Sequence, residues 1–480
     1  MSWWKLDREA LDRKRTWVTQ GPIVKVILAL ATPIVAARLL AATQESVDAI
    51  FLGRVSTEDL AAPAAASPLL WLFAGLGIGI NTTLSALVSQ AIGARDYASA
   101  QRYASKLLGA TLMLGAASAL AIILTAETVF ILQGFQGRSL EVALAYTLVE
   151  AVGMPFMLAL FYFNAVMAAS GDTRTPFKVS ALSSILNVIL DPILIFGLIL
   201  LPPLGAVGAA VATVLARAAA VSIAFYLLLR GAPGFRVKPS MPDRQLIGHI
   251  LRIGGPVSLQ RLVVSMGFLV MMGIVARLGA PVVAAYNVSL VIIHIVQSAT
   301  FGFNIATATV VGQNLGASNI SRAVRAAYTG VALVFGLLSI GAVAIVGGRS
   351  MLVSLFTSIE EVQFYAERMI SIVALGMPFL GAFFTAMGVA RGSGRTAFIS
   401  ALGIARLWLL RIPAAYTLVY IYSLGDMGVW LAMTLSNIIA GTLAIAWVAG
   451  RTWAKPIVKR VPPEPLGEKP PAIPEPAINR

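Results

Sequence analysis

Apolar runs of about 20 residues or more, each long enough to cross a bilayer as a helix, recur along nearly the whole chain. A backbone that crosses the hydrocarbon core finds no water there, so it must form helices or a closed barrel. These runs are too long and too continuous for barrel strands. The composition agrees, because 58% of the 480 residues are hydrophobic and only 12% are charged. We therefore expect an all-α integral membrane protein.

The distribution of basic residues predicts the orientation of this protein. The twelve predicted spans cover residues 22–52, 64–92, 104–126, 139–168, 177–201, 205–229, 251–278, 283–311, 324–346, 360–390, 398–422 and 428–450. With both termini on one side, the loops and tails on that side hold most of the 36 Lys and Arg residues. The opposite loops hold Arg54, Arg138, Arg277 and Arg349. This asymmetry predicts cytoplasmic termini and a multi-pass protein of the cell membrane. It also accounts for the net charge of +15 without nucleic acid as a partner.

The chain divides into five predicted segments. Residues 1–20 are charged and contain several Trp, which indicates an interfacial helix and not a signal peptide. Residues 21–230 and 251–453 each contain six spans, and residues 231–250 form a basic cytoplasmic linker between them. Residues 454–480 are rich in proline and are expected to be disordered. The chain has no cysteine, which excludes disulfides, thiol catalysis and cysteine metal sites.

The second set of six spans repeats the first at a displacement of 223 residues. The segment VSQAIGARDYASAQRYA from Val88 aligns with VGQNLGASNISRAVRAA from Val311, and SGDT from Ser170 aligns with SGRT from Ser393. Because six is an even number, both halves cross the membrane in the same direction, which predicts two pseudo-symmetric six-helix bundles. Transporters built from such repeats bind their substrate between the halves. Other aligned pairs are Pro33 with Pro256 and Arg38 with Arg261.

Two carboxylates lie inside predicted spans of the first half, at a depth where a charge costs roughly 3 kcal/mol even on lenient insertion scales. They are Asp48 and Asp191, and the second half has no acid at the aligned positions. A residue that occurs in only one half is not required by the shared scaffold, so these acids indicate a function. The aligned pairs are Asp48 with Met271, Glu45 with Phe268, Asp191 with Arg411 or Ile412, and Thr213 with Met433.

Further polar residues lie on the same helix faces as the two aspartates. Glu45 precedes Asp48 by three residues and Asn187 precedes Asp191 by four, so each pair shares one face of its helix. The expected partner of such a face is a proton, a metal cation or an arginine. We favour a coupling-ion site, because intramembrane acids flanked by amides and hydroxyls mark ion and proton paths.

A structural ion pair is the competing interpretation of these acids. Arg38 and Arg217 are its candidate counter-ions, since both lie inside predicted spans of the same half. Glu150 and Glu367 also lie inside predicted spans, and the pattern assigns them no role beyond a polar lining.

Several short motifs occur in a fixed order along the chain. They are ALATPIV, Asp48 followed by FLG, VSQAIGARD and VGQNLGA, the SGDTRTP loop, NVILDP and RLWLLRIP. This set resembles the multidrug and toxic compound extrusion (MATE) transporters, and more narrowly their archaeal and DinF-like branch. The similarity extends from Gly21 to Trp453. It implies a MATE/MOP-type fold and an antiporter that exports organic, often cationic and aromatic compounds against an inward flow of protons or sodium ions.

The resemblance also implies roles for single residues. The coupling residues of the matching branch correspond to Asp48, Asn164, Asn187, Asp191 and Thr213. With sodium as the coupling ion, the implied ligands are Asp48, Asn187, Asp191 and Thr213, and no cofactor is expected. Where relatives often carry an aromatic residue and an asparagine before the helix 1 aspartate, this chain reads TQESVD, with Gln44 and Glu45. Like charges one turn apart resist simultaneous ionisation, so Glu45 joins the predicted coupling site and the ion stoichiometry stays open.

The expected mechanism couples ion binding to a bend in the first span. Protons or a sodium ion at Asp48 and Asp191 remove their repulsion and let the helix bend at Pro33, where a backbone hydrogen bond is missing. Both proton and sodium coupling stay open. The substrate, a small organic compound, is expected to stack on or hydrogen-bond to Gln44, Tyr146 and Asn164.

Other classes of function fit this sequence less well. A flippase for lipid-linked oligosaccharides or another amphipathic lipid needs a cationic cavity, for which Arg38 and Arg261 are candidates. An ion channel needs a ring of filter groups, which one chain with two diverged halves does not readily supply. An enzyme is not expected, because His249 and His294 lie on different spans and no G-x-x-x-x-G-K-S/T motif occurs. We expect a monomer in the lipid bilayer.

Overall fold

The computed structural model of this protein describes residues 8–198 and 202–458, and these residues form helices joined by turns, without a strand. The first half contains α1 Arg8–Gln20, α2 Ile23–Leu52, α3 Thr57–Gly93, α4 Tyr97–Leu132, α5 Gly137–Ala169, α6 Arg174–Ile195 and α7 Gly205–Arg230. The second half contains α8 Arg244–His249, η1 Ile250–Gly254, α9 Gly255–Ala276, α10 Ala280–Gln297, α11 Ala299–Gly316, α12 Ile320–Gly347, α13 Arg349–Ser354, α14 Glu360–Val373, η2 Ala374–Gly376, α15 Met377–Ser393, α16 Ala397–Ala405, η3 Arg406–Arg411, α17 Ile412–Tyr416, η4 Thr417–Ile421 and α18 Asp426–Ala449.

The twelve predicted spans are confirmed within the described residues, where 12 helical runs are long and apolar enough to cross a membrane. Their bounds extend further than predicted in several places. The second span begins at Thr57 and continues through Pro63 and Pro68, whereas we expected it to begin at residue 64. The helix begins there because Ser56 caps it: the Ser56 Oγ accepts a hydrogen bond from the backbone N–H of Asp59 at 3.0 Å.

The internal repeat is visible in the ends of the helices. Helices α3 and α11 end at Gly93 and Gly316, which are 223 residues apart, and α4 and α12 begin at equivalent positions as well. The turns between them hold Arg95 and Ser318, another equivalent pair, in the left-handed conformation at φ 63° and 62°. The two halves are therefore copies of one fold.

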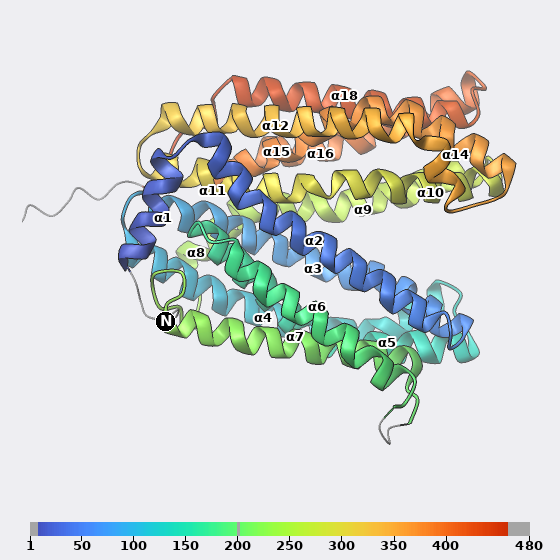
Figure 1. Cartoon of the computed structure of the whole chain (residues 1–480), viewed down its shortest axis with the longest axis horizontal. Helices are drawn as coiled ribbons and strands as arrows, with labels where there is room; N and C mark the ends of the chain where they lie inside the picture. The colour runs from blue at the N-terminus through green and yellow to red at the C-terminus, as the bar shows by residue number, and fades with distance from the viewer. Residues whose placement is uncertain (1–7, 199–201, 459–480) are drawn as a thin grey trace, which may run out of the picture.

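The helices of the two halves form two bundles (Figure 1). The bundles approach each other at the end of the molecule that carries α1 and α8, here termed the α1 end, and diverge toward the other end (Figure 1). At the α1 end α3 lies against α11 so closely that a side chain on Gly316 would place its Cβ 1.9 Å from the backbone oxygen of Gln90. A Cβ on Gly93 would lie 2.1 Å from the oxygen of Gln313. Glycine is required at both positions because backbone meets backbone.

Helix α2 belongs to both bundles. Its early residues, among them Ile27 and Ala31, pack with residues of α11 and α12, whereas Leu52 at its end packs with Ala62 and Ile195 of the first half. The second half repeats this exchange, because Ile253 of η1 packs into the core of the first bundle. The predicted division at residues 21–230 and 251–453 therefore does not describe the packing of the first span of each half.

The linker and the tail differ in part from the expectation. The linker 231–250 contains α8, capped by Asp243, whose Oδ1 accepts from Leu246 N at 2.9 Å, and this helix runs into the seventh span. Of the tail expected to be disordered, residues 454–458 are ordered, and Ile457 N donates to Gln90 Oε1 at 2.7 Å. The rest of that prediction, at 459–480, and the first residues of the predicted interfacial helix, 1–7, lie outside the described residues.

Candidate functional site

A cluster of polar side chains lies between α2, α6 and α7, inside the first bundle. Asp191 is 0% exposed, Asn187 1% and Thr213 7%, so α6 and α7 bury this face completely against their neighbours. Asp48 of α2 lies on the other side of the cluster and is half-buried. The exposure pattern confirms that the polar faces read from the i, i+3 and i, i+4 spacing point into the bundle.

Asn187 is the centre of this cluster. With its amide nitrogen toward the acids, Asn187 donates to Asp48 Oδ1 at 3.2 Å and to Asp191 Oδ2 at 3.3 Å. In the same orientation its oxygen accepts from Thr213 Oγ1 at 3.1 Å and from the Thr213 backbone N–H at 3.3 Å. The side-chain amide of Gln44 lies 2.7 Å from the Asn187 nitrogen. One asparagine thus links three helices.

The carboxyl groups of Asp48 and Asp191 also lie within hydrogen-bond distance of each other. Two ionised carboxylates would repel at that distance, so the contact requires a proton or a cation between them. Neither acid forms an ion pair with a basic side chain in the part of the chain that the structure describes.

The two arginines considered as counter-ions have other partners. Arg217 Nη1 donates to Glu150 Oε2 at 2.6 Å, and only its longer-range attraction reaches Asp48. Arg38 lies over the ring of Phe301, with its Cζ 5.4 Å from the ring centroid. The structural ion-pair interpretation therefore does not describe Asp48 or Asp191.

Sequence reasoning missed the Glu150–Arg217 ion pair. Glu150 was assigned only to a polar lining, yet it is 5% exposed and charge-paired. The signal was present, since these are opposite charges inside spans of one bundle and a buried charge needs a partner. Glu367 pairs with Arg349, at 3.6 Å between Oε2 and Nε.

The remaining predicted residues lie around the cluster and are not all part of it. Glu45 is exposed and acts on Asp48 by charge alone. Tyr146 packs at the edge of the core around Leu52, one turn from Glu150 on α5. Pro33 lies inside α2, which continues through it as one helix.

Asn164 is not brought into the cluster by any hydrogen bond between described residues. Its Oδ1 is buried without a partner. Because α5 ends at Ala169 and the antiparallel α6 begins at Arg174, Asn164 lies level with the first turns of α6, about two turns short of Asn187. Its assignment to the coupling site and to the substrate stays a prediction.

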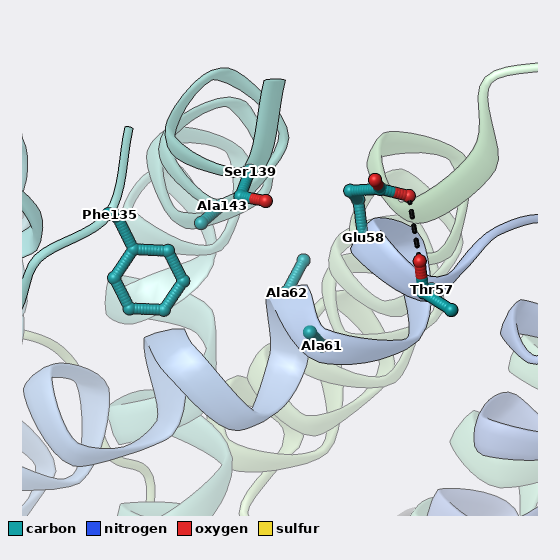
Figure 2. Close-up of a pocket in the computed structure, with 7 residues that line it drawn as sticks. All are labelled: Thr57, Glu58, Ala61, Ala62, Phe135, Ser139 and Ala143. Carbon is teal, nitrogen blue, oxygen red and sulfur yellow. Dashed lines mark hydrogen bonds between the residues drawn. The ribbon is translucent and has the colours of Figure 1, made fainter. Parts of the chain in front are cut away.

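A small pocket of about 200 Å³ lies at the end of the first bundle opposite α1 (Figure 2). Glu58 and Thr57 at the start of α3 face Phe135 and Ser139 across it (Figure 2). The pocket includes none of the residues predicted to bind substrate. In the described part of the chain no three His, Asp or Glu residues come together as metal ligands.

Two repeated six-span bundles, with a buried acid cluster in one of them, define a polytopic membrane transporter and not an enzyme. The MatE family model matches residues 33–193 and 256–417, one stretch in each half, and the chain belongs to the MatE family. The two matched stretches correspond to the internal repeat.

Curated relatives cover nearly the whole chain. The probable multidrug resistance protein NorM of Thermotoga maritima is 26% identical over 443 residues, covering 90% of this chain and 94% of that protein. The multidrug export protein MepA of Staphylococcus aureus is 24% identical over 399 residues, covering 82% and 87%. A crystal structure of MATE in the bent conformation superposes with a TM-score of 0.85 at 23% identity, covering 91% of this chain and 97% of that one. The fold is shared throughout.

Proposed function

We propose that this protein is an antiporter that exports organic, often cationic and aromatic compounds in exchange for protons or sodium ions. The names of its relatives, multidrug resistance and multidrug export proteins, support the export of such compounds. The observation that carries the ion coupling is the contact between the carboxyl groups of Asp48 and Asp191, without a basic partner among the described residues. The narrower assignment to the archaeal and DinF-like branch rests on the motifs alone.

The cluster offers both ions a place. A proton shared by Asp48 and Asp191 accounts for their contact, and we favour the proton as the coupling ion. Sodium would use oxygens of Asp48, Asn187, Asp191 and Thr213, which are the hard ligands that such a cation prefers. Neither ion is a resident cofactor, because each passes through the site in every cycle.

Helix α2 is the element that we propose to transmit ion binding to the bundles. Asp48 near its end belongs to the ion cluster, and Ala31 near its start packs on α11 of the second bundle, where a Cβ on Gly302 would lie 2.6 Å from the Ala31 oxygen. Pro33 lies between these two contacts and leaves one helical hydrogen bond unmade. A bend there would change how α2 joins the two bundles.

The orientation follows from the basic residues of the loops and tails, which support cytoplasmic termini. The α1 end is then cytoplasmic, and its close backbone packing supports an arrangement closed to the cytoplasm. Because both bundles and the ion cluster lie within one chain, we propose a monomer as the working unit.

Efflux from reconstituted vesicles tests this function. Protein in vesicles loaded with a cationic dye should export the dye under an imposed pH gradient, and an imposed sodium gradient in separate vesicles identifies the ion. Asp48→Asn and Asp191→Asn should each abolish coupled export, because the amide cannot release a proton. Glu127→Gln, at an exposed acid near the end of α4, is the matched control and should transport normally. Full coupled transport by both aspartate variants would contradict the proposal.

A further inference from the structure

The second bundle contains two buried arginines that share one amide oxygen. Arg406 Nη1 and Arg411 Nη2 each donate to Asn437 Oδ1 at 2.7 Å, and Arg411 Nε donates to Ser436 Oγ at 3.0 Å. Arg406 is 6% exposed and Arg411 4%. Two guanidinium groups therefore lie side by side inside a membrane-spanning bundle.

The π-helical turn η3 creates this arrangement. Its hydrogen bonds connect residues five apart, so Arg406 and Arg411 lie above one another on one side, whereas an α-helix would direct them apart. Phe383 lies under Arg406, with its ring centroid 5.4 Å from Cζ, and Trp408 Nε1 donates to Val263 O at 2.9 Å. These contacts hold the turn and its two charges in place.

The positive charge of this pair is not balanced by the protein. Neither arginine forms an ion pair with any described carboxylate, and the acids of this bundle that do pair, Glu367 and Asp426, bind Arg349 and Arg368. Arginine stays protonated in proteins, so the pair cannot become neutral by losing a proton. The Nε of Arg406 is also buried without a hydrogen-bond partner. A double charge in so poor a dielectric calls for an anion.

We propose that Arg406 and Arg411 form a binding site for an oxyanion, a carboxylate or phosphate group. Guanidinium forks match the geometry of such oxygens, and the unpaired Nε of Arg406 is a donor available to it. The site is the counterpart of the acid cluster, because Arg411 stands where the repeat aligns Asp191. The second bundle thus binds an anion at the place where the first bundle binds a cation.

Thermal unfolding and calorimetry of the purified protein test the site. Sodium phosphate should raise the unfolding midpoint by several degrees above sodium chloride at equal ionic strength, because a ligand of the folded state stabilises it. Arg406→Gln and Arg411→Gln should each weaken phosphate binding roughly tenfold or more. Arg277→Gln, at an exposed arginine of the same bundle, should bind phosphate normally. Equal midpoints in phosphate and chloride for the unmodified protein would overturn the proposal.

A second variant keeps the test valid if the arginine variants do not fold. Asn437→Asp has nearly the same shape as the native residue and adds a carboxylate between the two arginines. The variant should unfold at a higher temperature than the native protein and should no longer respond to phosphate. A phosphate response that persists in Asn437→Asp would contradict the site.

The oxyanion has two possible sources, a free anion or the acidic group of a transported compound. Export of an anionic dye and of a cationic dye by Arg411→Gln separates them. Selective loss of anionic-dye export assigns the site to substrate, and an equal effect on both dyes, with phosphate binding lost, assigns it to a free anion. Unimpaired phosphate binding by Arg411→Gln overturns the site under either assignment, independently of whether the proposed antiport is correct.

Discussion

Gln90 and Gln313 occupy equivalent positions in the two halves, and each reaches into the opposite bundle. Gln90 Nε2 donates to Gly392 O at 2.9 Å, and Gln313 Nε2 donates to Ala169 O at 2.8 Å. The two acceptors are themselves 223 residues apart, so one interaction closes the α1 end twice. The symmetry is incomplete, because Gln90 Oε1 also accepts from Ile457 N at 2.7 Å whereas Gln313 Oε1 is buried without a partner.

Replacing these glutamines should open the α1 end. Gln90→Leu and Gln313→Leu each remove an amide donor and leave a backbone oxygen unpaired, a loss of about 1–3 kcal/mol apiece. Gln90→Leu should have the larger effect, because it also loses the bond to the tail. Since the chain has no cysteine, spin labels at Arg174→Cys and Arg395→Cys report the separation of the bundles by electron resonance. The label distance should lengthen in both variants and stay unchanged in Gln101→Leu, an exposed glutamine of α4.

Substitution of the interface glycines should have the same consequence by a steric route. Gly316→Ala would place a Cβ 1.9 Å from the Gln90 oxygen, so α3 and α11 must separate. Gly336→Ala is the matched control, because a Cβ there meets nothing within 4 Å and the change gains helix propensity, about 1 kcal/mol. The same spin labels should show a longer distance in Gly316→Ala alone. An unchanged distance would mean that this contact does not hold the α1 end closed.

The fold was largely predictable from the sequence because its determinants are local or repetitive. Long apolar runs fix the spans, and equivalent punctuation such as Gly93 and Gly316 reveals the repeat. The packing of α2 was not predictable, since its early residues are as apolar as its late ones and nothing in them distinguishes one bundle from the other. Pro63 misled the boundary of the second span because a proline is tolerated in an early turn of a helix.

The candidate site was predictable where residues share a helix and less so where they meet across helices. Asn187 and Asp191 follow from i, i+4 spacing, whereas the Glu150–Arg217 ion pair depends on the rotation of α5 against α7. The pairing of Arg406 with Arg411 depends on the π-turn of η3, and regular helical spacing predicts that residues five apart diverge. No propensity signal in RLWLLR indicates that turn.

Breaking the Glu150–Arg217 pair should destabilise the first bundle. Glu150→Gln leaves a guanidinium with no carboxylate partner in a buried site, which costs roughly 3–5 kcal/mol. The unfolding midpoint of the purified protein should fall steeply, and the double variant Glu150→Gln with Arg217→Met should recover part of the loss, because no charge is then left unpaired. Additive losses in the double variant would show that the two side chains do not interact.

Acid should weaken the attachment of α1 to the turn between α5 and α6. Lys14 Nζ lies 2.8 Å from Asp172 Oδ2, and Thr175 donates its backbone N–H to Asp172 Oδ1 at 3.0 Å. Burial alone would raise the pKa of the Asp172 carboxyl, but the Lys14 ammonium and the Thr175 hydrogen bonds hold that pKa below its ordinary value of 3.8.

A lowered pKa in the folded state means that Asp172 contributes its stability fully above the ordinary value. The contribution is lost as the pH falls through the lowered folded pKa, because the folded state then gives up its preference for the ionised form. The difference in unfolding midpoint between the native protein and Asp172→Asn should therefore be constant near neutral pH and shrink below about pH 4. Lys14→Met should reduce this pH dependence, since it removes the charge that lowers the pKa. A difference that stays constant down to about pH 3 would show that the ionised Asp172 does not hold α1 in place.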